Sequence, residues 1–203
     1  VYGNEVSFTT TDLANPGPTV PVVGTSPSTI TASSSASSGG YISSDGGSTV
    51  TARGVCWSTI ANPTLADNFT TDGSGMGYFT SSVTGLSGCA TVYYIRAYAT
   101  NSTGTAYGNQ NTVSTGLISI LTTDDVTSIS YYSAVSGGNI TDDGGCPITQ
   151  KGVCWSYASN PTIGNSKTTE GAGSGTFVSN ITGLYANRTY YVRAYSTNIV
   201  GTT

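Results

Sequence analysis

Side chains that could carry out acid–base or nucleophilic catalysis are scarce in this chain. It contains no histidine, which is the usual general base, the usual activator of a nucleophile and the commonest metal ligand. Serine is abundant, but the chain has neither a Gly-x-Ser-x-Gly nucleophile elbow nor a Gly-Lys-Ser/Thr phosphate-binding loop. We therefore expect no enzymatic activity, no catalytic residue and no cofactor.

Two acidic pairs are the candidate metal ligands, Asp124-Asp125 and Asp142-Asp143. Carboxylate oxygens bind Ca²⁺ when several of them are spaced along one loop, and no such series accompanies either pair. An Asp before Gly-Gly is typical of a turn, and residues 45–47 repeat this sequence with a single Asp. We expect turns here and no metal site.

The four cysteines are the remaining reactive groups, and four cysteines allow three fully paired arrangements. Cys56 and Cys154 occupy equivalent positions in two copies of a repeat, whereas Cys89 and Cys146 each occur in one copy only. Unpaired cysteines are often small packed side chains, and we interpret Cys56 and Cys154 in this way.

The chain contains one unit twice, with a spacing of 98 residues through blocks that begin at Ser37 and Val135. Both blocks contain Gly-Val-Cys-Trp-Ser, Asn-Pro-Thr and Thr-Gly-Leu. A period near 100 residues is too long for a solenoid and suits consecutive domains. We predict a closing strand, a linker, a first domain and a second domain without its last strand, at residues 1–10, 11–19, 20–116 and 117–203.

Short runs rich in Thr, Tyr and Val, separated by Gly and Asn, indicate an all-β fold. In the first copy we expect seven strands, at residues 20–25, 32–42, 51–58, 68–72, 78–83, 92–100 and 107–115. In the third strand, Val50 predicts that Cys56 points inward and Val55 predicts the opposite. A β-bulge at Gly54 would resolve this conflict.

The charge pattern excludes two classes of partner. Only 8% of residues are charged, the net charge is −4 and no segment is basic, so we expect no nucleic acid partner. No apolar run approaches the ~20 residues of a membrane span, so we expect no membrane insertion.

One strand occurs in both copies as Tyr-Tyr-x-Arg-Ala-Tyr, at residues 93–98 and 190–195. Alternation along the strand predicts that Tyr93, Ile95, Ala97 and Ala99 face the core. It directs a second set of tyrosines outward, which we interpret as cross-strand pairs that stiffen a sheet: Tyr94, Tyr98, Tyr191 and Tyr195. The alternative is that these rings grip surface glycans or a neighbouring protofilament.

Together with the preceding Leu and the following Asn-x-x-Gly, this strand resembles the sixth strand of fibronectin type III domains. The resemblance implies two tandem fibronectin type III/Ig-like β-sandwiches. It makes Tyr93 and Tyr190 the tyrosine-corner residues, whose hydroxyls bond to upstream backbone. Trp57 and Trp155 lie on the third strand rather than the second, so the details of the core are not transferred.

The motifs that occur in both copies also resemble those of tandem modules in large secreted bacterial surface and filament proteins. This resemblance implies an extracellular or cell-surface location. In a type III sandwich the loop of Cys89 lies at the C-terminal end of its domain and the loop of Cys146 at the N-terminal end. Stacked domains would bring these two loops together. The resemblance therefore implies a disulfide between Cys89 and Cys146, provided that their Cα atoms lie within ~7 Å.

Residues 1–10 repeat the last strand of the first domain, since Tyr-Gly-Asn at residue 2 matches Tyr-Gly-Asn at residue 107. The chain ends where the second domain would enter that strand, and we expect residues 1–10 of a neighbouring subunit or repeat to fill the vacant edge. The donor residues lie on one face of the strand: Tyr2, Asn4, Val6 and Phe8. The acceptor edge consists of inward residues of the sixth strand: Tyr190, Val192 and Ala194.

We therefore expect a structural subunit of an extracellular, pilus-like bacterial filament that binds copies of itself head to tail by donor-strand complementation. The extra seven residues between the closing strand and the first domain, compared with the link after residue 115, favour exchange between subunits. Two alternatives stay open at this point. The chain is a covalent stalk segment of a giant adhesin, or it is a carbohydrate-binding accessory module of a secreted enzyme.

Overall fold

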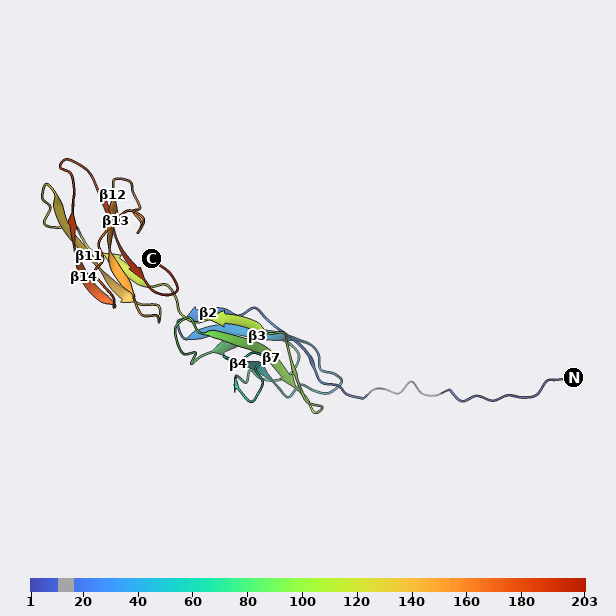
Figure 1. Ribbon diagram of the computed structural model, residues 1–203. Coiled ribbons are helices and arrows are strands. Elements are labelled where there is room, and N and C mark those ends of the chain that lie inside the picture. Colours follow the sequence, from blue (N-terminus) through green and yellow to red (C-terminus); the bar gives the residue numbers. More distant parts are fainter. Residues whose placement is uncertain (11–16) are drawn as a thin grey trace.

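The protein is built from antiparallel β-sheets (Figure 1). The computed structural model describes residues 1–10 and 17–203, and these contain fifteen β-strands. Within these ranges no helix has the length and apolar character needed to cross a membrane. We refer to residues 17–116 as the N-terminal half and to residues 117–203 as the C-terminal half, since each contains its own sheets and its own apolar cluster. The all-β prediction is confirmed.

The N-terminal half contains two sheets. In the first sheet, β3 pairs with β1 and β2 along one edge and with β6 along the other; the strands are β1 (Val22–Thr25), β2 (Thr29–Ala32), β3 (Ser35–Ser44) and β6 (Gly77–Val83). In the second sheet, β7 pairs with β4 on one side and with β8 and β9 on the other; the strands are β4 (Ala52–Ser58), β5 (Asn68–Phe69), β7 (Val92–Thr100), β8 (Thr105–Tyr107) and β9 (Asn111–Ser114).

The C-terminal half repeats this pairing with fewer strands. Its first sheet has the order β10-β11-β14, formed by β10 (Ile120–Thr123), β11 (Ser133–Asp142) and β14 (Gly175–Thr182). Its second sheet has the order β13-β12-β15, formed by β12 (Gln150–Ser156), β13 (Ser166–Lys167) and β15 (Tyr191–Thr197). Among the residues that the structure describes, β15 therefore has no counterpart of β9 beside it.

An apolar cluster lies between the two sheets of each half. In the N-terminal half, Val55 of β4, Phe79 of β6 and Ile95 of β7 belong to one buried cluster. The equivalent cluster of the C-terminal half contains Val153 of β12 and Phe177 of β14. Because strands alternate their side chains between two faces, each cluster draws on every second residue of its strands.

Two of the predicted strands are divided in the structure. A turn at residues 33 and 34 separates β2 from β3, and residues 108–110 separate β8 from β9. The second division is occupied by a side chain, since the Arg96 Nε donates a hydrogen bond of 2.9 Å to the Gly108 carbonyl. The predicted linker at residues 11–19 lies mostly outside the described residues; within it, the Thr19 amide donates to the Gly46 carbonyl.

Tyr98 and Tyr195 lie on the face of their strands away from the apolar clusters, as predicted, but this face is covered, since both side chains are only 2% exposed. Gly54 lies opposite Tyr98 in the sheet, and its missing Cβ leaves room for the ring. The segment that follows β5 then covers the ring, and the Tyr98 hydroxyl donates a hydrogen bond of 2.7 Å to the Thr70 carbonyl. Neither tyrosine is available for glycans. Tyr94 is half-buried and Tyr191 is exposed.

The predicted β-bulge at Gly54 is wrong, because β4 pairs with β7 in continuous register from Ala52 to Ser58. Val55 faces the apolar cluster, and Cys56 faces the opposite side of the sheet. Cys56 is nevertheless buried, since the loop that contains Pro63 covers it and the Pro63 carbonyl accepts a hydrogen bond from the Cys56 thiol at 3.3 Å. Both faces of this strand are thus covered, which alternation alone does not reveal.

The acidic pair at residues 142 and 143 forms turns. The carboxylate of Asp142 accepts a hydrogen bond from the Gly144 amide, and that of Asp143 accepts one from the Gly145 amide, each at 2.8 Å. Asp45 makes the same contact with the Gly47 amide at 2.9 Å. Each carboxylate is engaged by the backbone of its own turn.

Replacement of Tyr98 by Phe tests the internal role of this tyrosine. Loss of the buried hydroxyl leaves the Thr70 carbonyl without its donor, so we expect the free energy of unfolding to fall by about 1–2 kcal/mol. The measurement is urea denaturation followed by tryptophan fluorescence. Tyr191→Phe is the matched control, because Tyr191 belongs to the equivalent strand of the second copy and is exposed. It should change the free energy of unfolding by less than ~0.5 kcal/mol. Equal effects of the two variants would contradict the buried hydrogen bond.

Candidate strand-accepting groove

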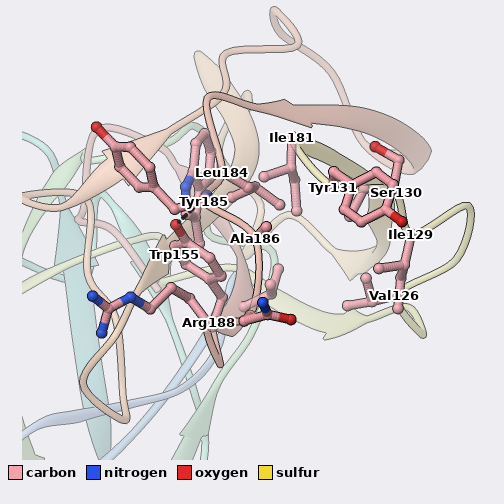
Figure 2. Close-up of a pocket in the computed structure, with 14 residues that line it drawn as sticks. Val126, Ile129, Ser130, Tyr131, Trp155, Ile181, Leu184, Tyr185, Ala186 and Arg188 are labelled. Atoms are coloured by element: carbon pink, nitrogen blue, oxygen red, sulfur yellow. Dashed lines mark hydrogen bonds between the residues drawn. The ribbon is translucent and has the colours of Figure 1, made fainter.

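An open, largely apolar groove of about 610 Å³ lies beside β15 in the C-terminal half (Figure 2). Val126, Ile129 and Tyr131 line one side of it, and Trp155 and Arg188 line the other. Its floor comes from the core itself: Ala134, Ile181, Leu184, Tyr190 and Val192. The groove is therefore an opening into the apolar cluster rather than a surface depression.

The N-terminal half shows what fills the equivalent space. There β9 pairs with β7, with Val113 opposite Tyr93 and Asn111 opposite Ile95. Val113, Tyr93 and Ile95 are all buried. In the C-terminal half the residues equivalent to Tyr93 and Ile95 are Tyr190 and Val192, and both are only half-buried. The groove is thus the site that β9 occupies in the other copy.

The structure brings together two of the three predicted acceptor residues. Tyr190 and Val192 lie side by side along the groove. Ala194 does not belong to it, because its side chain is buried and its amide donates a hydrogen bond of 2.9 Å to the Thr123 hydroxyl. The prediction that Ala194 is exposed is wrong, since β10 crosses over β15 at this level and covers it.

Several lining residues escaped the sequence prediction, above all Val126, Ile129 and Tyr131. The repeat itself carries a signal for them. At a spacing of 98 residues, Val126 takes the place of Ser28 and Ile129 takes the place of Thr31. Apolar residues thus line this side of the groove in the second copy, where the first copy has polar residues.

A second hollow, of about 310 Å³, lies further along β15 and is lined by Ile163 and Arg193 among others. In the N-terminal half Tyr107 occupies the equivalent place. Its hydroxyl accepts a hydrogen bond of 3.2 Å from the Leu65 amide, and the Arg96 guanidinium lies 4.9 Å from the centre of its ring. Ile163 and Arg193 are the equivalents of Leu65 and Arg96.

The predicted donor residues lie on an extended segment that is exposed along its whole length. Val6 and Phe8 are each 87% exposed. Residues 1–10 extend away from the N-terminal half, on the side opposite to the C-terminal half (Figure 1). Within the described part of the chain they belong to no sheet, so the structure does not bring donor and acceptor of one chain together.

The tyrosine-corner positions make the upstream backbone contacts that the resemblance implies. The Tyr93 hydroxyl accepts a hydrogen bond of 2.9 Å from the Ser87 amide. The Tyr190 hydroxyl accepts one of 3.0 Å from the Tyr185 amide and lies 2.9 Å from the Tyr157 hydroxyl. These contacts hold the loop before the sixth strand against each half, and in the C-terminal half that loop borders the groove.

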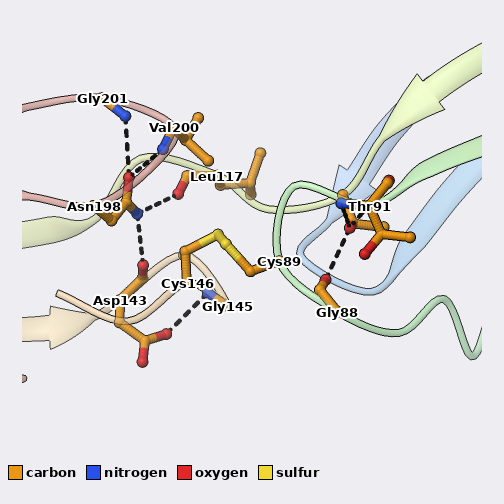
Figure 3. The surroundings of a disulfide bond; sticks show 12 residues. Gly88, Cys89, Thr91, Leu117, Asp143, Gly145, Cys146, Asn198, Val200 and Gly201 are labelled. Carbon is orange, nitrogen blue, oxygen red and sulfur yellow. Dashed lines mark hydrogen bonds between the residues drawn. A yellow bond between two sulfur atoms is a disulfide. The ribbon is translucent and has the colours of Figure 1, made fainter. Parts of the chain in front are cut away.

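Cys89 and Cys146 form a disulfide, with a Cα–Cα distance of 5.0 Å and a sequence separation of 57 residues (Figure 3). This prediction is confirmed. The bond joins the loop before β7 to the loop before β12, and hence the two halves. Beside it, the Asn198 amide donates hydrogen bonds to the carbonyls of Leu117 and Asp143, at 2.8 and 2.9 Å. These hydrogen bonds lie within the C-terminal half and hold the start of that half against the turn that precedes Cys146.

The chemistry available at these sites is that of packing and backbone pairing. The described residues contain no cluster of three or more His, Cys, Asp or Glu side chains that could hold a metal ion. Cys56 and Cys154 are free and buried. Burial raises the pKa of the Cys56 thiol to about 11, and burial also raises that of the Cys154 thiol. Protonated thiols of this kind are poor nucleophiles and poor metal ligands.

No family model and no curated protein matches the chain. Among solved structures it is similar to the crystal structure of the chicken CNTN1 FN1-FN3 domains, with 12% sequence identity and a TM-score of 0.37. The match covers 91% of this chain and 65% of that chain, so this chain spans less than two thirds of its length. The all-β architecture is assigned from the strand pairing described above.

The disulfide leads to a prediction about stability. In the variant Cys89→Ser/Cys146→Ser we expect the free energy of unfolding to fall by roughly 2–4 kcal/mol, because the bond closes a loop of 57 residues in the unfolded chain. Urea denaturation with and without reductant measures this. Reductant should lower the stability of the wild type to that of the variant and leave the variant unchanged. A wild type that is insensitive to reductant would contradict the bond.

The raised pKa leads to a prediction about Cys56. Its thiol has a pKa of about 11 in the folded chain against 9.0 ordinarily, so its stabilising contribution is complete below pH 9 and is lost as the pH rises toward 11. At pH 8 we expect iodoacetamide to leave Cys56 unmodified in the folded chain and to modify it in urea. Peptide mass spectrometry gives the readout. Rapid labelling of the folded chain would contradict the burial.

Proposed function

We propose that the protein is a structural, non-enzymatic subunit of an extracellular filament and polymerises head to tail by donor-strand complementation. Residues 1–10 of one copy would enter the groove beside β15 of the next and supply the strand that β9 supplies in the N-terminal half. The observation that carries the proposal is the groove itself, which opens into the apolar cluster at the place where β9 is found in the other copy. The disulfide is compatible with an extracellular location.

The register of β9 on β7 specifies how the donor strand would pair. Residues 2–10 align with residues 107–115, so Phe8 takes the place of Val113 and Val6 that of Asn111. By the observed pairing, Phe8 would lie opposite Tyr190 and Val6 opposite Val192. Both side chains then point into the groove. Their burial would contribute about 1.5–3 kcal/mol each.

Donor and acceptor differ from the N-terminal half in a compensating way. There the Asn111 side-chain amide donates to the Ser26 carbonyl at 2.6 Å and lies 3.4 Å from the Ser28 hydroxyl. At the equivalent positions the loose strand has Val6 and the groove wall has Val126. A polar pair within one half thus corresponds to an apolar pair between donor and groove.

A second exchange of this kind concerns size. Ile30 packs against the same cluster as Val113 in the N-terminal half. The equivalent residues are Ser128 and Phe8, so a smaller residue in the acceptor accompanies a larger one in the donor. Close packing favours such conserved total volume. These substitutions support a specific fit between residues 1–10 and the C-terminal half.

The second hollow along β15 fits the start of the donor strand. Tyr2 is the equivalent of Tyr107, and it lies six positions before Phe8, just as Tyr107 lies six positions before Val113. In this register the Tyr2 ring would lie over the Arg193 guanidinium, which is exposed in the chain by itself. One strand would therefore fill both hollows at once.

The chain is too short to fill its own groove. Residues 10 to 19 can span at most ~30 Å. The Thr19 amide is hydrogen bonded to the Gly46 carbonyl, and the chain that follows residue 16 enters the N-terminal half at the end away from the C-terminal half (Figure 1). The N-terminal half alone is at least as long as β7, about 30 Å. In the proposed register residue 10 would reach the far end of the C-terminal half. Residues 1–10 can therefore fill only the groove of another copy, and a contact of this type continues into a filament.

The variant Phe8→Asp tests the proposal. We expect the wild-type chain to form filaments and Phe8→Asp to stay monomeric, because a carboxylate cannot be buried opposite Tyr190 without a partner. Ser7→Asp is the matched control, since it adds the same charge on the outward face, where the equivalent Thr112 is exposed. Electron microscopy and sedimentation give the readout. Filaments of Phe8→Asp that equal those of Ser7→Asp would overturn the proposal.

The covalent stalk is the competing function, because residues 1–10 could equally be the last strand of a preceding domain in one long chain. The mass of the native assembly after denaturation, with and without reductant, separates the two. A single species near 20.6 kDa supports separate subunits. A much larger chain that survives both treatments supports the stalk.

A further inference from the structure

The two halves differ most at the C-terminal end of each sandwich, which is the end that faces the next domain along the chain. Four small hydroxyl residues of the N-terminal half are replaced by tyrosine in the C-terminal half. Ser33, Ser34, Thr59 and Ser87 correspond to Tyr131, Tyr132, Tyr157 and Tyr185. The alignment is structural as well, since the Leu86 amide donates to the carbonyl of residue 34 and the Leu184 amide to that of residue 132. We call the four tyrosines the tyrosine pole.

In the N-terminal half, Ser33 is half-buried against the C-terminal half and needs to be small, whereas Ser34, Thr59 and Ser87 are exposed. A Cβ built on Gly145 would lie 2.5 Å from the Cβ of Ser33. Cys89, in the neighbouring loop, is bonded to Cys146. The two halves are so close that a ring at position 33 would collide with the turn at residue 145.

The tyrosine pole is exposed at all four positions, so large rings stand where the N-terminal half has small residues. Its four side chains are 77%, 67%, 54% and 69% exposed in chain order. The rings are nevertheless ordered by contacts, because Tyr131 and Tyr132 have ring centres 6.4 Å apart and Tyr157 lies 4.7 Å from the Tyr190 ring. Clustered, pre-oriented tyrosines with free faces are typical of protein interfaces.

The tyrosine pole is continuous with the groove. Tyr131 and Tyr185 of the pole also line the groove, together with Arg188. In the N-terminal half Thr115, the residue after β9, accepts a hydrogen bond from the Thr91 amide through its hydroxyl. The equivalents of Thr115 and Thr91 are Thr10 and Arg188. A donor strand in the groove would thus end beside the tyrosine pole, and the residues from 11 onward would continue next to it.

We infer that the tyrosine pole is the docking surface for the next copy of the chain, namely for its residues 11–18 and the turn at the start of its N-terminal half. This inference rests on the proposed function. One residue, Gly116, connects Thr115 to Leu117 within the chain, whereas eight residues connect Thr10 to Thr19. The longer connection leaves a wider space between copies, and larger side chains stand on the surface that faces it. The incoming segment also carries apolar residues, Leu13, Pro16 and Pro18.

The test replaces two tyrosines that lie outside the groove with the residues of the N-terminal half, in the variant Tyr132→Ser/Tyr157→Thr. The matched control removes an exposed tyrosine pair of β3 and β6, whose ring centres are 4.4 Å apart. Tyr41→Asn/Tyr78→Thr introduces the residues that the C-terminal half has at these positions. Both variants keep every residue of the donor strand and of the groove lining, and Tyr157→Thr also removes the hydroxyl that lies 2.9 Å from the Tyr190 hydroxyl.

We expect all three chains to form filaments. Those of Tyr132→Ser/Tyr157→Thr should lose subunits in dilute denaturant at least about tenfold faster than the wild type, and the angle between successive subunits should vary more in electron micrographs. The control should behave as the wild type. Adding Phe8→Asp to each chain gives monomers, whose equal unfolding midpoints would show that the faster loss is not a folding defect.

Three results would overturn the inference while leaving the proposed function intact. The first is unchanged dissociation and unchanged angles in the tyrosine variant. The second is a loss of monomer stability that accounts for the faster dissociation. The third is binding of cellohexaose by the wild type and not by the variant, with filaments unaffected, which would assign the tyrosines to a glycan. Failure of the wild type to form filaments would instead contradict the proposed function.

Discussion

The edge of β15 is the constraint on which the rest of the structure depends. A β-sandwich encloses its core only if both sheets extend far enough to cover the inward residues of their outermost strands, and an edge left open offers unpaired backbone groups to another chain. In the N-terminal half β9 meets this requirement, and Tyr93 and Ile95 are buried. In the C-terminal half the same fold, with nearly the same residues, leaves Tyr190 and Val192 beside an open groove. The two halves can therefore be compared directly, because one molecule contains the same site once filled by β9 and once open.

The junction between the two halves shows the other extreme. There five residues, 115–119, connect β9 to β10, and the disulfide joins the loop before β7 to the loop before β12. Small residues make this approach possible, as at Ser33 opposite Gly145. The molecule is therefore fixed at its centre and open at its end, and the residues at each end differ accordingly. Small hydroxyl residues and glycines lie at the junction between the two halves, and tyrosines lie at the far end of the C-terminal half.

Much of this fold could be predicted from the sequence, because strand alternation and the internal repeat constrain each other. The disulfide followed from two cysteines, each unique to one copy, together with the ends at which a type III sandwich places their loops. The errors share one cause. Alternation places Tyr98 on an open face and the missing last strand places Ala194 at an open edge, yet each is covered by a segment distant in sequence: the residue after β5 and β10. Alternation divides a strand into two faces but does not say which face is covered. The groove wall at Val126 and Ile129 was missed because its significance appears only when the two copies are compared position by position.

The Cys89–Cys146 bond also has a mechanical consequence. When the chain is pulled along its long axis, tension passes from the N-terminal half to the C-terminal half through Gly116 and the disulfide together. The segment between the cysteines, whose sequence separation is 57 residues, cannot extend while the bond is intact, so about 200 Å of contour length is withheld from stretching. That segment includes β7, β9 and β11, the strands on which both cores are built. In the proposed filament the segment enclosed by each disulfide would therefore not lengthen under tension, and stretching would be limited to the segments outside it.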